Sequence, residues 1–222
     1  MSWLFHTYIY EPILSVLAFL YQHLSFNDLG ISIIELTILV RLILLPVFYK
    51  STKDQTILQR LQPHIKKIQL DHKDDKERQA RELMALYQQH RVNPFTGFFL
   101  LLIQLPVFVA LFQIFTKGIG GELFQGNRWF LGILDLGEKS WLLVIVAAAL
   151  QFLQSKMMLL KKTANTTTAT STQNLMLFVG PLLTIVILGN LPAAIGLYWL
   201  VSNVFSLVQQ IYINKKVESI TS

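Results

Sequence analysis

The chain has 222 residues, of which 53% are hydrophobic and only 14% are charged, and its formal net charge is +6. Charged residues make up about a quarter of a typical soluble domain, so this composition argues against a soluble protein and favours a helical membrane protein. The absence of cysteine excludes a disulfide framework and a thiolate metal site. In such a protein, excess Lys and Arg indicates a basic cytoplasmic face, and no direct nucleic-acid function is predicted.

Residues 1–28 contain an apolar stretch that begins at Trp3, ends at Leu24 and is interrupted by Glu11 and Pro12. Its aromatic residues suit the interface between lipid and water. The stretch is therefore expected either to lie along the membrane surface as a helix or to span the bilayer. No Lys or Arg precedes it, which argues against a secretory signal peptide.

The segment 29–49 is long and apolar enough to span a bilayer, yet Arg41 lies inside it. A guanidinium near the middle of a membrane helix costs about 2.5–3.5 kcal/mol on insertion scales, and such residues usually face protein or water and serve a function. Thr37 lies one turn before Arg41 on the same helix face, whereas Glu35 lies on a different face. Water and neutral side chains, rather than a carboxylate, are therefore expected to solvate Arg41.

Residues 50–93 are rich in charged residues and glutamine. Apolar residues recur at helical spacing before and after the polar stretch 71–75, which predicts two amphipathic helices in a water-exposed cytoplasmic hairpin. Pro63 is expected to bend or restart the first of these helices. The charged surface is either a solvated face or a docking surface for a partner.

The rest of the chain alternates between apolar segments and polar connections. The predicted division is an amino-terminal segment 1–28, a first span 29–49, a cytoplasmic hairpin 50–93, a second span 94–116, an outside loop 117–140, a third span 141–160, a Thr-rich cytoplasmic loop 161–174, a fourth span 175–190, a fifth span 191–213 and a short cytoplasmic tail 214–222. Most Lys and Arg residues fall in the segments placed inside. This distribution predicts that the first confident span starts outside and that the carboxy-terminus is cytoplasmic.

The other predicted spans contribute mainly neutral polar groups, among them Gln104, Gln154 and Asn203. Individually, such a residue is more often an interhelical hydrogen-bond partner than a functional site. The sequence has no recognisable set of metal ligands, no nucleophile with a paired base and no Gly-rich phosphate loop, so catalysis and cofactor binding have little support. A lone arginine with neutral amides favours a water-filled groove, which would lower the desolvation barrier for a polar segment entering the membrane.

Four stretches resemble the YidC family of membrane protein insertases, which has mitochondrial and chloroplast relatives. They are V-R-L-I-L-L-P at 40–46, L-Q-P-H-I-K-K-I-Q-L-D-H-K-D-D-K-E-R at 61–78, V-N-P-F-T-G-F-F-L-L-L-I-Q-L-P-V-F at 92–108 and L-P-A-A-I-G-L-Y-W-L-V-S-N-V-F-S-L-V-Q-Q at 191–210. The last two stretches are the most specific. Their order and spacing match the family from about residue 8 to residue 213.

The resemblance implies an all-α membrane protein with five transmembrane helices around a hydrophilic groove, a cytoplasmic helical hairpin and an amino-terminal interfacial helix. By similarity Arg41 is the charge in the groove. The other candidate groove residues are Thr37, on the face of Arg41, and Gln104, Gln154, Trp199 and Asn203. No cofactor and no metal is expected.

The implied function is that of a membrane protein insertase and chaperone without a hydrolytic active site. Nascent membrane proteins and membrane lipids are the expected partners, with the ribosome and the Sec translocon as further candidates. Two alternatives stay open: a small transporter or channel with an Arg-lined anion site, and an assembly chaperone without insertion activity.

The sequence departs from the family at Phe98 and Leu100, where Cys and Pro are common, and this affects the expected local packing. Lys215 and Lys216 stand where some relatives have a long basic tail, so autonomous ribosome binding is expected to be weak. No transit peptide is recognisable, which favours a bacterial plasma (inner) membrane over an organelle.

Overall fold

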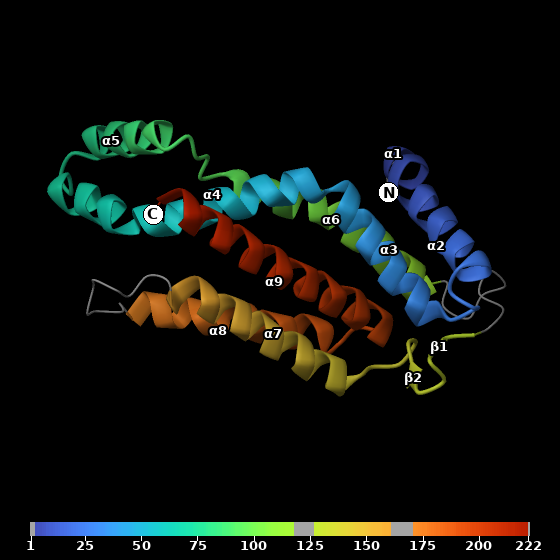
Figure 1. The fold of residues 1–222 in the computed structure, drawn as a ribbon. Helices are drawn as coiled ribbons and strands as arrows, with labels where there is room; N and C mark the ends of the chain where they lie inside the picture. Colours follow the sequence, from blue (N-terminus) through green and yellow to red (C-terminus); the bar gives the residue numbers. More distant parts are fainter. Residues whose placement is uncertain (1–2, 118–126, 161–170, 222) are drawn as a thin grey trace.

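The structure is a computed structural model that describes residues 3–117, 127–160 and 171–221. The described chain is built from long helices that run side by side, with one small β-hairpin at the end of the bundle remote from the charged segment (Figure 1). Most of the predicted Thr-rich loop 161–174 and part of the predicted outside loop 117–140 lie outside the described residues.

The amino-terminal segment forms one nearly continuous helical stretch, made of α1 (Trp3–Phe5), the π-helix η1 (His6–Tyr10) and α2 (Glu11–His23). Pro12 cannot donate a backbone N–H and its ring crowds the preceding turn. The wider π-helical turn directly before it, closed by the Glu11 N–H to the His6 carbonyl, lets the helix continue. Buried Leu17 and Tyr21 join α2 to the core of the bundle.

The predicted first span 29–49 is divided between two helices. Helix α3 (Leu29–Ile43) begins at an Asp28 cap and ends before Leu44, and α4 (Leu45–Asp71) leaves at an angle of 70° to α3. Pro46 explains the break, because it cannot continue α3 but is tolerated in the first turn of α4. Helix α4 then continues past Pro63, so no new helix begins at that proline.

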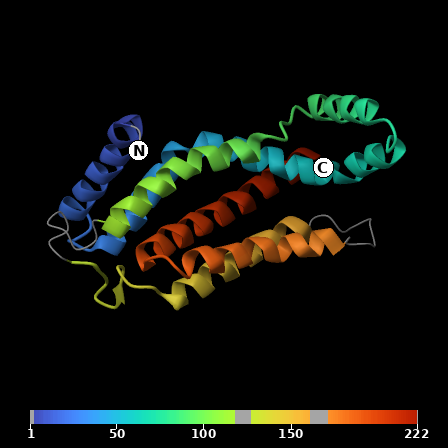
Figure 2. The same ribbon diagram turned by 180° about the vertical axis from the view of Figure 1, so that it is seen from behind.

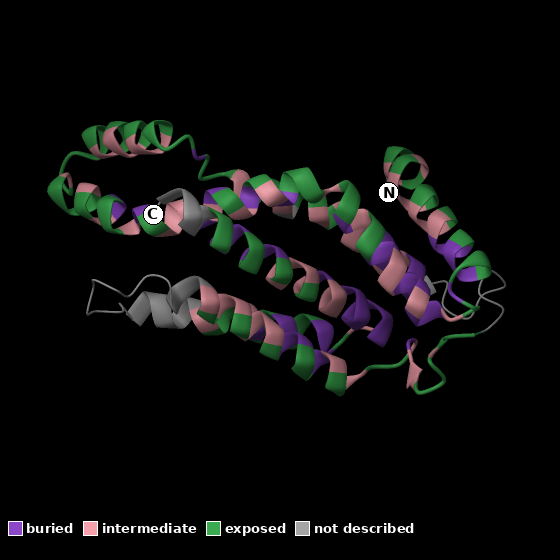
Figure 3. Cartoon of the chain, viewed as in Figure 1, coloured by how far each residue is buried: buried purple, intermediate pink, exposed green. Residues whose placement is uncertain are grey.

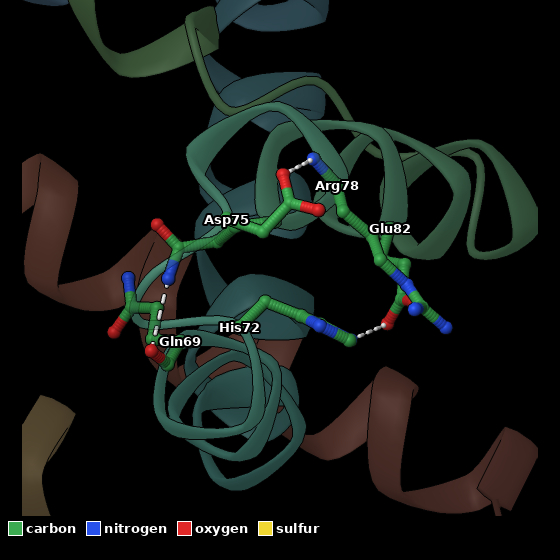
Figure 4. A network of polar contacts seen from close by, with 6 residues as sticks. Gln69, His72, Asp75, Arg78 and Glu82 are labelled. Carbon is green, nitrogen blue, oxygen red and sulfur yellow. Dashed lines mark hydrogen bonds and ion pairs between the residues drawn. The ribbon is translucent and has the colours of Figure 1, made fainter.

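The charged segment folds as a helical hairpin of α4 and α5 (Lys76–Gln89). A small apolar cluster fills the space between the two helices; its buried members are Leu61, Ile65 and Val92. At the tip, His72 Nε2 lies 2.9 Å from a Glu82 carboxylate oxygen, and the Asp75 side chain caps α5 by accepting from the Arg78 N–H at 2.9 Å (Figure 4). The Gln79 side chain donates to the Gln69 carbonyl at 2.9 Å, which also ties the two helices together.

Four further helices complete the bundle: α6 (Thr96–Lys117), α7 (Trp141–Leu160), α8 (Ser171–Leu188) and α9 (Ala193–Thr221). In both views α9 lies between the α3–α4 pair and the α7–α8 pair, and its carboxyl end reaches α4 near the hairpin (Figure 1 and Figure 2). Helix α9 is therefore the element that contacts α3, α4, α6 and α7.

The apolar core is concentrated at the end of the bundle that carries β1 (Trp129–Phe130) and β2 (Leu134–Asp135), as the burial colouring of α2, α3 and α9 shows (Figure 3). These two strands pair in antiparallel fashion inside the segment that the sequence predicted to be a loop. Arg128 and Asp135 close the hairpin with an ion pair of 2.9 Å. Away from this core, large apolar side chains of α6, α7 and α8 are exposed, as expected for helices that face lipid.

By length and composition, three of the described helical stretches could each cross a membrane: Trp3–His23, Thr96–Thr116 and Ala193–Lys216. The bent pair α3–α4 adds a fourth if both helices are taken as one span. The predicted third and fourth spans correspond to the shorter apolar helices Trp141–Met157 and Leu177–Leu188. The number of five spans stays a prediction.

Candidate functional site

Arg41 lies in the last turn of α3 and is only 7% exposed. Its guanidinium carbon lies 4.4 Å from the centre of the Phe48 ring and 6.0 Å from the centre of the Phe205 ring. Phe48 comes seven residues after Arg41. In a straight helix that residue would lie about 10 Å farther along the axis, so the 70° bend between α3 and α4 is what brings the ring back over the charge.

No Asp or Glu of the described ranges forms an ion pair with Arg41. Glu35 lies on another face of α3, where its carboxylate accepts a hydrogen bond of 2.6 Å from the buried Ser25 hydroxyl. Thr37, one turn before Arg41, donates its hydroxyl to the Ile33 carbonyl at 2.6 Å. Within the part of the chain that the structure describes, Nη1 of Arg41 is buried without a hydrogen-bond partner.

Tyr198 of α9 connects Arg41 to α6. It is buried, lies close enough to Arg41 to interact with its charge, and its hydroxyl accepts a hydrogen bond from Nε2 of Gln104. Tyr198, Ser202 and Phe205 follow one another at helical spacing, so they share one face of α9. Tyr198 and Phe205 were not predicted as site residues, although both lie in the stretch 191–210, one of the two most specific stretches of the resemblance.

Trp199 and Asn203 lie next to that face, one residue farther along α9. The Trp199 ring meets Phe108 of α6 edge to face, with centroids 6.0 Å apart. The Nε1 atom of Trp199 and the Nδ2 atom of Asn203 are buried and have no hydrogen-bond partner among the described residues. Since Arg and Trp can only donate, the site has an excess of buried N–H groups that require an acceptor.

Gln154 lies on α7 and is half-buried, without a hydrogen bond to another described residue. One turn earlier, Gln151 packs against α8, where a Cβ atom added at Gly180 would lie 3.2 Å from its Nε2. Arg41 therefore has a ring contact with Phe48 and an electrostatic interaction with Tyr198, which is hydrogen-bonded to Gln104. No such interaction joins Gln154 to these residues within the described ranges.

A second set of buried polar side chains lies between α4 and the carboxyl half of α9. We call Thr56, Gln210 and Asn214 the α4–α9 polar cluster. The Gln210 amide donates to the Thr56 hydroxyl at 3.0 Å and to the Asn214 carbonyl oxygen at 2.9 Å. Nearby on α4, Asp54 is only 5% exposed and accepts a hydrogen bond of 2.8 Å from Thr96 at the start of α6. Asp54 belongs to the charged segment 50–93, whose charges were expected to form a solvated face or a docking surface.

Among the described ranges, no three His, Asp or Glu side chains are placed so that they could hold a metal ion together. The arrangement offers instead a buried cation, aromatic rings, amides and a phenol. Such groups can hold water or bind carbonyl and carboxylate oxygens through hydrogen bonds, without forming covalent intermediates.

Comparison with known proteins identifies the family. The family model described as the 60Kd inner membrane protein matches residues 19–220. The membrane protein insertase YidC of Fusobacterium nucleatum is 35% identical over 213 residues, which cover 95% of this chain and 98% of that protein. The membrane protein insertase MisCA of Bacillus subtilis is 35% identical over 210 residues, covering 91% of this chain and 76% of that protein.

Other relatives are longer. The YidC insertase of Syntrophus aciditrophicus is 36% identical over 218 residues, which are 97% of this chain but only 37% of that protein.

A crystal structure of an active YidC insertase with its first transmembrane domain resolved has the same fold: its TM-score is 0.68, at 23% identity over 94% of this chain and 46% of that chain. The predicted all-α membrane fold is thereby confirmed, and the apolar helices and the relatives are those of a multi-pass inner membrane protein. The chain belongs to the YidC family of membrane protein insertases.

Proposed function

We propose that this chain inserts nascent membrane proteins into the lipid bilayer and assists their folding there as a chaperone. A short polar segment of the substrate would pass beside Arg41, and the adjoining apolar segment would move into lipid. The observation that carries the proposal is the buried guanidinium of Arg41, which has an unpartnered Nη1 atom and no carboxylate partner among the described residues. Family membership supports the same activity.

The physical reason is the cost of moving a polar segment through hydrocarbon. Each unpaired backbone or side-chain polar group costs several kcal/mol there, roughly 2–7 kcal/mol by transfer measurements. The donors of Arg41 and Trp199 that have no partner among the described residues would bind carbonyl and carboxylate oxygens of the passing segment and replace part of its water. Transfer of the apolar segment into lipid supplies the driving force, so no hydrolytic step is included in the proposal.

The proposed path is a hydrophilic groove that is open to the cytoplasm and to lipid, with five spans around it. Arg41, Thr37, Gln104, Gln154, Trp199 and Asn203 are its proposed lining. Tyr198 is added because its hydroxyl binds Gln104 and because it interacts with the charge of Arg41. The α4–α5 hairpin would lie on the cytoplasmic side and would meet the substrate, the ribosome or the Sec translocon first. This orientation places the carboxy-terminus in the cytoplasm.

The charge of Arg41 can be tested with the purified chain in liposomes and a single-span substrate that has a short acidic outside tail. We expect Arg41→Ala to lower insertion by at least about tenfold, since loss of a charge-assisted hydrogen bond costs roughly 1.5–3 kcal/mol. Arg41→Lys should retain most of the activity, because the positive charge is kept. Equal insertion by the wild type and Arg41→Ala would refute the role of the charge.

Two controls separate the competing functions. Anion flux through the same liposomes in the absence of substrate protein would favour a channel or transporter with an arginine site. Site-specific crosslinking from Arg41, α7 and α9 should capture nascent chains if the protein inserts them. Crosslinks only to folded membrane proteins would favour assembly assistance without insertion.

A further inference from the structure

Two aromatic rings from different parts of the chain flank the charge of Arg41. Phe48 belongs to α4 and Phe205 belongs to α9, and their ring centres lie 4.4 Å and 6.0 Å from the guanidinium carbon. Phe48 is itself buried. The charge on α3 is therefore held at the point where three helices meet, by the faces of rings and not by an acid of the described ranges.

A ring and a carboxylate stabilise a guanidinium in different ways. A carboxylate binds the in-plane N–H groups, so it neutralises the charge and occupies the donors. An aromatic ring attracts the cation through its π-face, and the guanidinium is planar with weakly hydrated faces, so stacking leaves the in-plane N–H groups available. Nη1 of Arg41 is buried and has no hydrogen-bond partner in the part of the chain that the structure describes, which agrees with the second arrangement.

We propose that Phe48 and Phe205 form an aromatic clamp, which positions the Arg41 guanidinium and stabilises its charge while leaving Nη1 available to acceptor groups of an incoming polypeptide segment. The clamp rests on the proposed insertase function for its purpose, although its existence does not depend on that function. It also assigns a role to the bend at Leu44, because without the bend Phe48 would lie a further turn or two away from the charge. Phe48 and Phe205 are positioning residues in this proposal, since they act through Arg41.

Graded fluorination tests the clamp, because each fluorine weakens the π-face of the ring with little change in its shape. Phenylalanine analogues with one, two or three fluorine atoms would be placed singly at positions 48, 205 and 178, and insertion of the acidic-tail substrate would be measured in liposomes. We expect a stepwise fall at position 48 that reaches about threefold to tenfold, from the usual strength of cation–π contacts. The longer contact at position 205 should give a shallower fall.

Position 178 is the matched control. Phe178 lies on α8, is 58% exposed and is not among the rings next to Arg41, so its fluorination should leave insertion unchanged. Phe48→Tyr and Phe48→Trp should retain most of the activity because they keep an aromatic face, whereas Phe48→Leu should not. A flat response at position 48, or an equal response at position 178, would overturn the clamp.

A measurement that does not use insertion separates failure of the clamp from failure of the proposed function. The melting temperatures of Arg41→Gln, Phe48→Leu and the double variant in detergent form a double-mutant cycle. The clamp predicts that Phe48→Leu lowers the melting temperature clearly more when Arg41 is present than when it is Gln. Additive effects would overturn the clamp even if Arg41 proved essential for insertion. If the effects of the two substitutions are coupled but the wild-type chain inserts no substrate, the proposed function is overturned and the clamp remains supported.

Discussion

Gly30, in the first turn of α3, shows how a single residue joins two distant segments. A Cβ atom built at Gly30 would lie 2.1 Å from Cδ2 and 2.6 Å from Cβ of Phe130, so the ring of β1 occupies the place of a side chain. Next to it, the Asp28 carboxylate accepts a hydrogen bond of 2.6 Å from the Leu131 N–H. The β-hairpin is therefore fixed on the amino-terminal end of α3.

We expect Gly30→Ala to lower the melting temperature in detergent. The clash costs about 1–3 kcal/mol, which exceeds the gain of up to about 1 kcal/mol that Ala brings to a helix. Gly97→Ala in α6 is the control, because the nearest atom there is Gln55 Nε2 at 3.4 Å, an ordinary contact. Combining Gly30→Ala with Phe130→Ala should remove the added penalty. A Gly30→Ala variant as stable as Gly97→Ala would contradict the proposed packing.

Residues of the site were predictable to different degrees. Arg41 was identified because a charge in an apolar segment is conspicuous whatever surrounds it. Tyr198 and Phe205 were missed, because α9 is apolar on most sides and its sequence does not indicate which face turns toward α3. That rotation is decided by tertiary packing. The burial of Asp54 was not predicted for the same reason, since a carboxylate next to Lys53 in a charged segment is usually solvated.

Among the elements, α9 and α4 are joined by hydrogen bonds rather than by apolar packing alone. The α4–α9 polar cluster is buried and its three side chains are hydrogen-bonded to one another. Such a network stabilises one helix register, because a shift would leave several polar groups unpaired. Its position near the base of the α4–α5 hairpin links this hairpin to the helix that carries Tyr198 and Phe205.

Gln210→Leu should therefore lower the stability of the chain by about 1–3 kcal/mol, the usual cost of leaving buried partners unsatisfied. The neighbouring Gln209→Leu is a matched control. Gln209 is also buried, but its Nε2 has no partner among the described residues, so this substitution should lower the stability less. Thermal unfolding in detergent measures both. Equal losses would show that the hydrogen bonds of the cluster do not stabilise α4 against α9.

A proline in the sequence does not by itself show whether a helix ends there. The apolar run 29–49 suggested one span, yet Pro46 within it starts a new helix and the axis turns by 70°. The opposite happened at Glu11-Pro12, where a π-helical turn preserves a nearly continuous helix. A proline thus marks a position of strain in the sequence, and the packing around it determines whether the helix bends, widens or ends.

For the molecule as a whole, composition and apolar run length were sufficient to predict an all-α membrane protein, because a continuous apolar run can pair its own backbone groups in lipid only as a helix. The arrangement of the helices around α9 depends on contacts between segments far apart in the chain, which these signals do not contain. The order of the polar segments nevertheless makes a global prediction. The α4–α5 hairpin and the β1–β2 hairpin lie at opposite ends of the bundle (Figure 1) and should face opposite sides of the membrane.

The chain contains no cysteine, so single cysteines can report this orientation without a background. Met84, on α5, is 55% exposed and Ile133, in the turn between β1 and β2, is 82% exposed, so Met84→Cys and Ile133→Cys should both fold and react freely with thiol reagents.

The excess of Lys and Arg on the hairpin side predicts that this side is cytoplasmic. In spheroplasts, a membrane-impermeant maleimide should therefore label Ile133→Cys at once and Met84→Cys only after the membrane is opened. The reverse pattern would invert the proposed topology, and labelling of both cysteines before opening would show that the two hairpins share one side. Either result would also remove the cytoplasmic entry route beside Arg41, since Arg41 lies in the last turn of α3, which leads into the hairpin, and the route requires the hairpin side to be cytoplasmic.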